Sequence, residues 1–347
     1  MSNISQVDQN FKVDSKINQE NIRFYNVLSA PFEVCGIYYE DGKFRRMPET
    51  VAKSVSERVC TLHAKTAGGR LRFRTDSPYV AVHAKMSEIY KVPHMTLCAS
   101  AGFDLYADGE FIGSFVPPMD MTDGYEALVK IKFPPKMRDI TIHFPIYSNV
   151  HALYVGLDGE ATLEAAAPYR SPHKIVYYGS SITQGGCASR PGAAYQAIVS
   201  RHFDMDYINL GFSGSAMGEK EISAYIKDLP MSVFVYDYDH NAYRAADLEQ
   251  THERMFLEIR EARPDLPIVI MSRPRRCLLE DDARRLEIIK TTYQNALARG
   301  DRRVWLLDGP TLMQLCGNEG LVDGIHPTDL GFFSMANALI EVLKDIL

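Results

Sequence analysis

The chain has 347 residues, enough for two ordinary domains, and its 46% hydrophobic and 24% charged residues are typical of a folded globular protein. Its formal net charge of -6 at pH 7 offers no basic surface and excludes nucleic acid as the expected partner. The six cysteines show no CxxC spacing, which indicates isolated thiols and neither a disulfide framework nor a zinc cage. Residues 1–20 are polar and predict a flexible lead-in without the apolar core of a signal peptide. No apolar run is long enough to span a bilayer, so we expect a cytoplasmic protein without membrane contacts.

Residues 21–167 carry the pattern of an N-terminal β-sandwich domain. Residues 71–75, 79–84 and 139–144 alternate apolar and polar side chains, as half-buried strands do. Residues 103–113 contain two further runs of this kind around an Asp-Gly turn, which predicts a hairpin. Many short strands and few helical patterns favour two packed antiparallel sheets.

The pattern changes at Pro168 and Pro172, where we place the boundary of a second domain, residues 173–347. Its predicted strands are residues 174–178, 207–210, 232–236, 268–271 and 304–307. Amphipathic helical patterns follow at residues 248–262, 283–298 and 331–347. Repeated βα units predict an α/β fold with a three-layer, doubly wound parallel five-stranded sheet. Sites in such sheets lie at the carboxyl ends of the strands, so the residues there are the functional candidates.

Ser181 follows the first of these strands directly after Gly179 and Ser180. A helix is about to begin here, and its free N–H groups favour developing negative charge, so the position suits a nucleophilic hydroxyl. The competing interpretation is that Ser180 or Ser181 caps the helix, which by itself is the more common role.

The second and third strands also end in polar segments. Gly214 lies in a glycine-rich turn that leaves backbone N–H groups open to a ligand, although an ordinary βα turn has the same composition. Asn241 follows the third strand and offers an amide donor to an oxyanion. Asp237 and His240 precede it and are candidates for positioning substrate, or they bond to neighbouring loops.

Asp323 and His326 precede the last helix. An aspartate three residues before a histidine can accept from one imidazole nitrogen and leave the other free to take a proton from a serine. A helix-start loop with a capping carboxylate is the alternative. A rival from another class is a metal-dependent reaction whose ligands would be Asp237, Asp239, His240, Asp323 and His326.

Three arginines follow the fourth strand in the segment SRPRR, namely Arg273, Arg275 and Arg276. A guanidinium at this edge would bind a carboxylate or phosphate of a substrate, and Arg273 is the candidate that we name for this role. For any single one of them, a solvated loop is the simpler interpretation.

In this order, the four segments resemble the SGNH or GDSL hydrolases. The resemblance implies that Ser181 is the nucleophile and His326 its base, oriented by Asp323. It implies an oxyanion hole formed by Ser181, Gly214 and Asn241. It implies neither a metal nor another cofactor.

Two positions depart from the family pattern: Ser180 replaces the aspartate of the GDS signature, and Asp239 stands where the third block has glycine. Residues 102–106 match the Gly-x-Asp-Leu-Tyr motif of a jelly-roll-like β-sandwich that precedes some SGNH domains. The whole plan, with a flavodoxin-like hydrolase domain behind it, resembles the two-domain carbohydrate acetylesterases.

The resemblance implies a serine ester hydrolase that works through an acyl-enzyme and deacetylates a carbohydrate or a related small ester. Its partner would be a small-molecule ester such as an acetylated sugar, and a homo-oligomer stays open. An acyltransferase with an alcohol acceptor would use the same residues. An inactive carbohydrate-binding protein is the alternative from a different class.

Overall fold

The computed structural model describes residues 15–347. Residues 1–14, which make up most of the expected lead-in, lie outside the described residues. The chain forms two compact units. The N-terminal unit contains the residues up to Arg45, Ala64–Pro168 and Arg190–Gly192, and the C-terminal unit contains Arg46–His63, Tyr169–Ser189 and Ala193–Leu347. Of the helices described, none is both long and apolar enough to cross a lipid bilayer.

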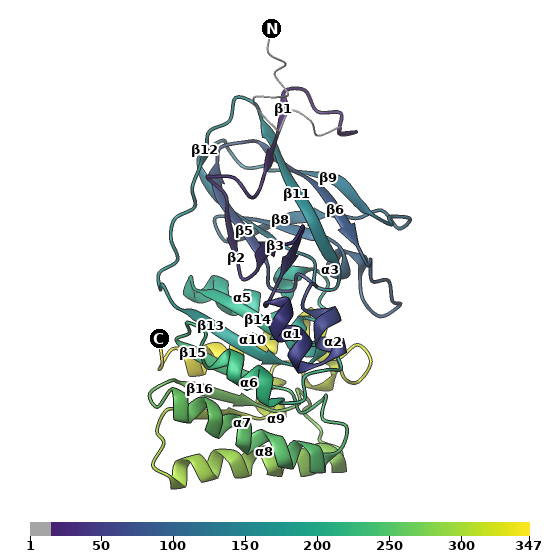
Figure 1. Ribbon diagram of the computed structural model, residues 1–347. Helices are drawn as coiled ribbons and strands as arrows, with labels where there is room; N and C mark the ends of the chain where they lie inside the picture. The colour runs from purple at the N-terminus through teal and green to yellow at the C-terminus, as the bar shows by residue number, and fades with distance from the viewer. Residues whose placement is uncertain (1–14) are drawn as a thin grey trace. The chain divides into compact units, whose positions relative to one another are not determined.

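The N-terminal unit is a sandwich of two antiparallel sheets (Figure 1). The four-stranded sheet has the order β1 (Ile22–Asn26), β11 (Asn149–Asp158), β6 (Tyr79–Ser87) and β9 (Gly124–Lys130). The second sheet has the order β12 (Leu163–Glu164), β5 (Arg70–Thr75), β10 (Arg138–His143), β7 (Phe103–Ala107) and β8 (Glu110–Phe115), with β2 (Glu33–Cys35) on β5. The unit also contains the hairpin of β3 (Tyr38–Glu40) and β4 (Lys43–Arg45) and the short helix α3 (Leu97–Ser100). The inward side chains of both sheets form one core, which confirms the expected β-sandwich.

The Gly-x-Asp-Leu-Tyr segment at the start of β7 has a physical explanation within this unit. Gly102 leaves no room for a side chain, because a Cβ would lie 2.5 Å from the carbonyl oxygen of Cys98. Asp104 is fully buried and accepts hydrogen bonds from the imidazole of His143 and the backbone N–H of Gly192, each at 2.8 Å. The hydroxyl of Tyr106 donates to the carbonyl of Gly192 at 3.2 Å. The motif therefore ties β7 to the segment Arg190–Gly192.

The C-terminal unit is built on a sheet of five parallel strands. Their order is β14 (Asp206–Gly211), β13 (Lys174–Gly179), β15 (Val233–Asp237), β16 (Ile268–Met271) and β17 (Val304–Leu307). In chain order this is 2-1-3-4-5, the order of the flavodoxin-like folds, which confirms the expected fold class. Both faces of the sheet are covered, which is why its inner strands β13, β15 and β16 are nearly continuous runs of buried residues.

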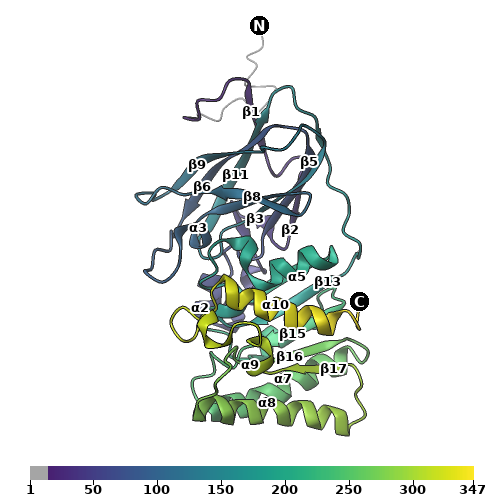
Figure 2. The same cartoon turned by 180° about the vertical axis from the view of Figure 1, so that it is seen from behind.

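Helices cover both faces of this sheet. One face carries α6 (Lys220–Ile226), α7 (Ala245–Ala262) and α8 (Glu280–Ala298), which share an apolar core with Tyr178 and Tyr236. The other carries α5 (Tyr195–Phe203) and α10 (Asp329–Leu343), where the ring of Tyr195 lies between those of Tyr177 and Phe332. Figure 1 shows α7 and α8 side by side, and Figure 2, the view from behind, shows α10 on the side that faces the viewer. Short helices lie in the connections: α4 (Ser181–Gln184), α9 (Gly309–Leu312) and the 3-10 turns Pro191–Ala193 and Gly317–Gly320.

The segment Arg46–His63 belongs to the C-terminal unit, whereas the sequence placed it within residues 21–167. It forms α1 (Glu49–Val55) and α2 (Glu57–Leu62), whose buried faces join the core beneath α6. Arg46 is 2% exposed and donates to the carbonyls of Asn209 (3.1 Å) and Gly211 (2.6 Å) at the end of β14. Its guanidinium also lies 4.7 Å from the centre of the Phe212 ring. A long-range contact of this kind leaves no local pattern in the sequence.

Candidate active site

The turn after β13 exposes one serine and uses the other as a cap. Ser180 is the N-cap of α4, and its hydroxyl accepts from the N–H of Ile182 at 3.2 Å. Ser181 is therefore not needed as a cap. A Cβ on Gly179 would overlap the carbonyl oxygen of Asp237 and Oγ1 of Thr183, so only glycine fits at this position. The cap and the tight turn together fix the direction of the Ser181 side chain.

The structure brings together the hydroxyl, imidazole and carboxylate that the sequence singled out. Oγ of Ser181 lies 2.9 Å from Nε2 of His326. Nδ1 of His326 lies 2.8 Å from Oδ2 of Asp323. The other oxygen of Asp323 accepts from the backbone N–H groups of Ile325 (2.9 Å) and His326 (2.8 Å). These bonds hold the imidazole ring by its Nδ1 side and point Nε2 toward the serine.

The same bonds determine the charge of Asp323. Partial burial raises the pKa of its carboxyl, but the hydrogen bonds from His326 and Ile325 outweigh burial and lower the pKa to about 2. The carboxylate is therefore ionised over the whole neutral and mildly acidic range. An anion beside Nδ1 would stabilise an imidazolium at this position.

This pKa predicts a defined pH dependence of stability. The folded pKa of about 2 lies below the ordinary value of 3.8, so the stabilisation from Asp323 is present above about pH 4 and is lost as the pH falls toward 2. We expect the difference in unfolding free energy between wild type and Asp323→Asn to be constant from pH 7 to 5 and to shrink below about pH 4. Urea unfolding of both proteins at each pH measures it. Asp345→Asn, an exposed position in the same unit, is the control and should show no such change. A difference that disappears already at pH 5 would contradict the assignment.

Backbone and side-chain donors lie at the ends of β13, β14 and β15. In the part of the chain that the structure describes, the N–H groups of Ser181 and Gly214 have no hydrogen-bond acceptor. Gly214 has a φ of 64°, in the left-handed region that favours glycine. Asn241 is 7% exposed, and its amide donates one hydrogen to the carbonyl of Phe212 at 2.9 Å. The second amide hydrogen remains for another acceptor.

Asp237 does not lie where a substrate would meet it. The carboxyl is 1% exposed and accepts from the hydroxyl of Thr183 in α4 at 3.1 Å. Burial raises the pKa of this carboxyl well above the usual range, and the neighbouring Asp239 raises it further. This hydrogen bond holds α4 against the end of β15.

His240 is half-buried beside the site. Burial lowers the pKa of its imidazole well below the usual value, and the positive charge of Arg273 acts in the same direction. A neutral imidazole here offers one donor and one acceptor. Within the described residues, no three of Asp237, Asp239, His240, Asp323 and His326 bring their ligand atoms to one point, so these five do not form the metal site considered as a rival.

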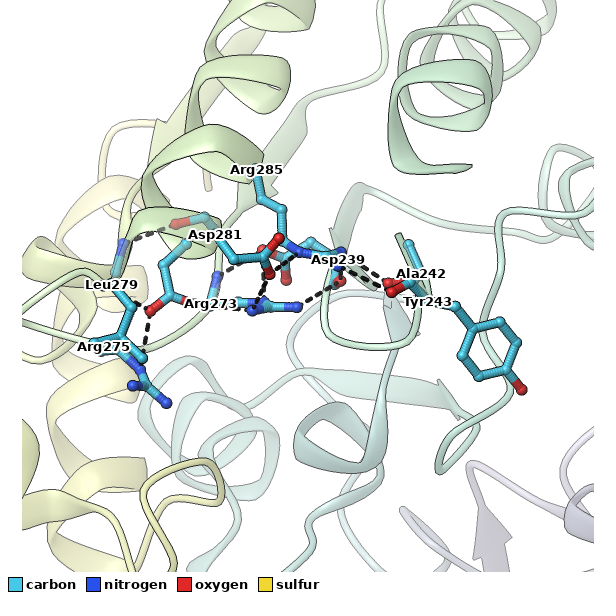
Figure 3. Close-up of polar contacts among 11 residues, drawn as sticks. Asp239, Ala242, Tyr243, Arg273, Arg275, Leu279, Asp281 and Arg285 are labelled. Carbon is cyan, nitrogen blue, oxygen red and sulfur yellow. Dashed lines mark hydrogen bonds and ion pairs between the residues drawn. The ribbon is translucent and has the colours of Figure 1, made fainter. Parts of the chain in front are cut away.

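Arg273 is held by acidic side chains (Figure 3). Its Nη1 lies 2.8 Å from Asp282 and 3.2 Å from Asp281, and its Nε lies 3.7 Å from Asp239. Its backbone N–H also donates to Asp239 at 3.2 Å. These three carboxylates neutralise the guanidinium and occupy its donors, so it attracts a substrate anion only weakly. The contacts favour a structural position for Arg273 and not the expected substrate contact.

Sequence analysis did not identify two further arginines that lie near the site. Arg285 of α8 is 3% exposed and reaches the turn that carries Asn241. In the sequence it is one of several charges on a helix, where a solvated face is the usual interpretation. Arg58 of α2 is exposed, and its Nη2 lies 3.5 Å from the place of a Cβ on Gly214. Its segment was assigned to the sandwich, so no sequence signal connected it with this turn.

The flavodoxin-like sheet, with a hydroxyl, an imidazole and a carboxylate in a row at its strand ends, defines an ester hydrolase of the SGNH class. The model of the GDSL-like lipase/acylhydrolase family matches residues 172–344. The GxDLY model, which describes the N-terminus of SGNH hydrolase-type esterases, matches residues 22–163. The chain belongs to the GDSL-like lipase/acylhydrolase family.

Solved structures share the whole two-part architecture. A protein from Bacteroides ovatus designated a GDSL-like lipase is 27% identical, with a TM-score of 0.83, over 94% of this chain and 98% of that one. A salicylyl-acyltransferase from a tetracycline biosynthetic pathway is 22% identical, with a TM-score of 0.75, over 95% and 99%. A family two carbohydrate esterase from Clostridium thermocellum is 13% identical, with a TM-score of 0.61, over 90% and 98%. The similarity to the acyltransferase and to the carbohydrate esterase is a similarity of fold. A search of curated proteins returned no match.

Proposed function

We propose that the chain hydrolyses a small ester through an acyl-enzyme on Ser181. The observation that carries the proposal is the row from Ser181 Oγ through His326 to Asp323, with contacts of 2.9 and 2.8 Å. Serine is a weak nucleophile at neutral pH unless an adjacent base takes its proton. A base within hydrogen-bond distance, itself oriented by an ionised carboxylate, meets that requirement.

In the first half-reaction, Ser181 Oγ attacks the ester carbonyl while His326 Nε2 accepts the hydroxyl proton. The tetrahedral intermediate then collapses, the bond to the alcohol oxygen breaks, and His326 returns the proton to the departing alcohol. In the second half-reaction, His326 takes a proton from water, whose oxygen attacks the acyl-enzyme. Collapse releases the carboxylic acid and restores the serine hydroxyl. No step requires a metal or an organic cofactor.

The oxyanion of both tetrahedral intermediates would be bound by the N–H groups of Ser181 and Gly214 and by the amide of Asn241. The two N–H groups without an acceptor support this assignment. The bond from Asn241 to Phe212 supports it as well, because it fixes one amide hydrogen and so orients the other. Donors held in place before the reaction stabilise developing charge without the cost of reorganisation.

The substrate that we propose is an acetyl ester of a carbohydrate or a related small alcohol. The fold shared with a family two carbohydrate esterase, sandwich included, supports this choice. The test is a series of p-nitrophenyl esters from acetate to octanoate together with acetylated sugars, with release of the acid measured. We expect acetyl esters to be turned over fastest and chains of eight carbons hardly at all. A preference for octanoate, without release of acetate from any sugar, would contradict the proposal.

The two alternatives give different products. An acyltransferase would pass the acyl group to an added alcohol faster than to water. The fold shared with the salicylyl-acyltransferase supports testing this alternative. Product analysis with an added alcohol separates transfer from hydrolysis. A carbohydrate-binding protein without activity would bind sugars and leave every ester intact, including esters with a good leaving group.

A further inference from the structure

Asp239 is the position at which the third block of this chain departs from the family pattern. The residue is 1% exposed and lies two positions before Asn241. Burial raises the pKa of its carboxyl to about 6, although Arg273 and Arg285 favour the ionised form. A buried carboxyl at a position that usually has no side chain needs partners. The structure provides one for Oδ2, which accepts from the backbone N–H of Arg273 at 3.2 Å, within a cluster of arginines and aspartates from three segments (Figure 3).

The first connection runs from this cluster to the turn that carries Asn241. Arg285 donates from Nη1 to the carbonyls of Asp239 (2.9 Å) and Ala242 (2.8 Å), and its Nη2 lies 3.4 Å from the carbonyl of Tyr243. These carbonyls stand on both sides of Asn241. One planar guanidinium therefore holds the turn before and after the amide that we assign to the oxyanion hole.

The second connection runs to the loop that carries His326. Arg275 pairs with Asp282 through Nε at 3.3 Å, and its Nη2 donates to the carbonyl of Gly324. Gly324 lies between Asp323 and His326 and has a φ of 80°, in the left-handed region. The arginine thus holds the loop at the point where its backbone turns.

The two connections meet at the start of α8. Nε of Arg285 pairs with Asp281 at 2.6 Å, and Arg273 joins Asp281 to Asp282 at 3.2 and 2.8 Å. Asp282 also accepts from the backbone N–H of Leu279 at 3.0 Å, which ties its carboxylate to the helix end. An unbroken path of charged contacts therefore links the Asn241 turn with the His326 loop.

We propose that Arg275 and Arg285 are positioning residues that set the places of His326 and Asn241 relative to Ser181. The proposal rests on the function proposed above. An error of about 1 Å in a catalytic group can cost on the order of 100-fold in rate, so contacts that hold these two loops in place bear directly on activity. Asp239, Asp282 and Arg285 are buried, and each has an oppositely charged side chain beside it, which avoids the cost of an isolated buried charge.

Arg275 gives the sharper test, because it is only partly buried and its neighbour Arg276 is a matched control. Arg276 is exposed and reaches the carbonyl of Gln314 (3.3 Å), outside the cluster. We expect Arg275→Ala to lower kcat about 10- to 100-fold with little change in KM, and Arg275→Lys to recover part of the loss. Arg276→Ala should behave as wild type. Wild-type kcat in Arg275→Ala, with only a lower melting temperature, would overturn the proposal.

A second readout asks whether Arg275 acts through the base. In a His326→Ala background, the Arg275→Ala change should cost no further activity, because the group that it positions is gone. An undiminished loss in that background would overturn the role. For the other connection, Arg285→Lys, which keeps the buried charge, should lower kcat in wild type and not in Asn241→Ala.

Hydrogen exchange tests the same proposal without the reaction. We expect faster exchange of the N–H groups of Ile325 and His326 in Arg275→Ala and unchanged exchange in Arg276→Ala. Unchanged exchange in both variants would overturn the positioning role even in an active enzyme. Faster exchange in a protein that turns over no ester would uphold the network and overturn the proposed function alone.

Discussion

Replacing Ser181 by alanine is expected to lower kcat for an acetyl ester by about 10⁵- to 10⁶-fold, because the acyl-enzyme can no longer form. The residual rate would come from the oxyanion donors and from substrate binding. The change removes one oxygen from a side chain that is 9% exposed, so the fold should be unaffected. Burst and steady-state kinetics with p-nitrophenyl acetate measure the loss, and mass spectrometry after treatment with a fluorophosphonate locates the label.

Ser180→Ala is the matched control for this prediction. It removes the N-cap of α4, which is worth about 1 kcal/mol of stability, but leaves the Ser181 hydroxyl in place. We expect this variant to melt at a lower temperature and still to be labelled on Ser181. Labelling that survives Ser181→Ala, or that moves to Ser180, would refute the assignment of the nucleophile.

The second large effect is expected at Asn241. Loss of one oxyanion donor costs about 10²- to 10³-fold in kcat, so Asn241→Ala should lower kcat by that factor while KM changes little. The donor acts on charge that exists only in the transition state, which is why the loss appears in kcat. Steady-state kinetics on the same acetyl ester measure both parameters.

Asn241→Asp distinguishes loss of the N–H donor from loss of the side-chain volume. The aspartate has nearly the same shape and offers no N–H at neutral pH. It should therefore lose at least as much activity as the alanine variant. Circular dichroism and a melting curve of both variants identify any loss from misfolding. Normal kcat in two folded variants would remove Asn241 from the oxyanion hole.

Much of the fold follows from local patterns. The strand pattern at residues 174–178 became β13, which is one residue longer at its end. The helical patterns at 248–262 and 283–298 became α7 and α8, each three residues longer at its start. Apolar periodicity predicts such elements because both faces of a parallel sheet must be covered. The Asp-Gly turn became the tip of the β7–β8 hairpin, with positive φ at Asp108 and Gly109.

Helices α1 and α2 show what local patterns could not predict. Their sequence is amphipathic over less than two turns each, and the segment is preceded and followed by strands of the sandwich. Its place in the C-terminal unit depends on Arg46 and on side chains buried beneath α6. Such contacts join residues that are far apart in the chain, and no periodicity records them.

The candidate site divides in the same way. Ser181 could be predicted because it directly follows a strand, and Asp323 and His326 because they form a recognisable segment before the last helix; the row that the structure forms from them agrees with that expectation. Arg273 could not be judged from sequence, because a guanidinium near a site serves equally well for substrate or for structure. Only its three carboxylate partners distinguish the two.

The sequence by itself determined the class of fold and the family, and it predicted the residues that would carry an ester hydrolysis, because periodicity and motif spacing are local properties of the chain. The tertiary structure alone decided which serine caps α4 and which arginines surround Asp239. It also decided that Arg46–His63 packs with the parallel sheet. Each of these depends on the direction of a side chain toward a distant partner, and packing and burial set that direction.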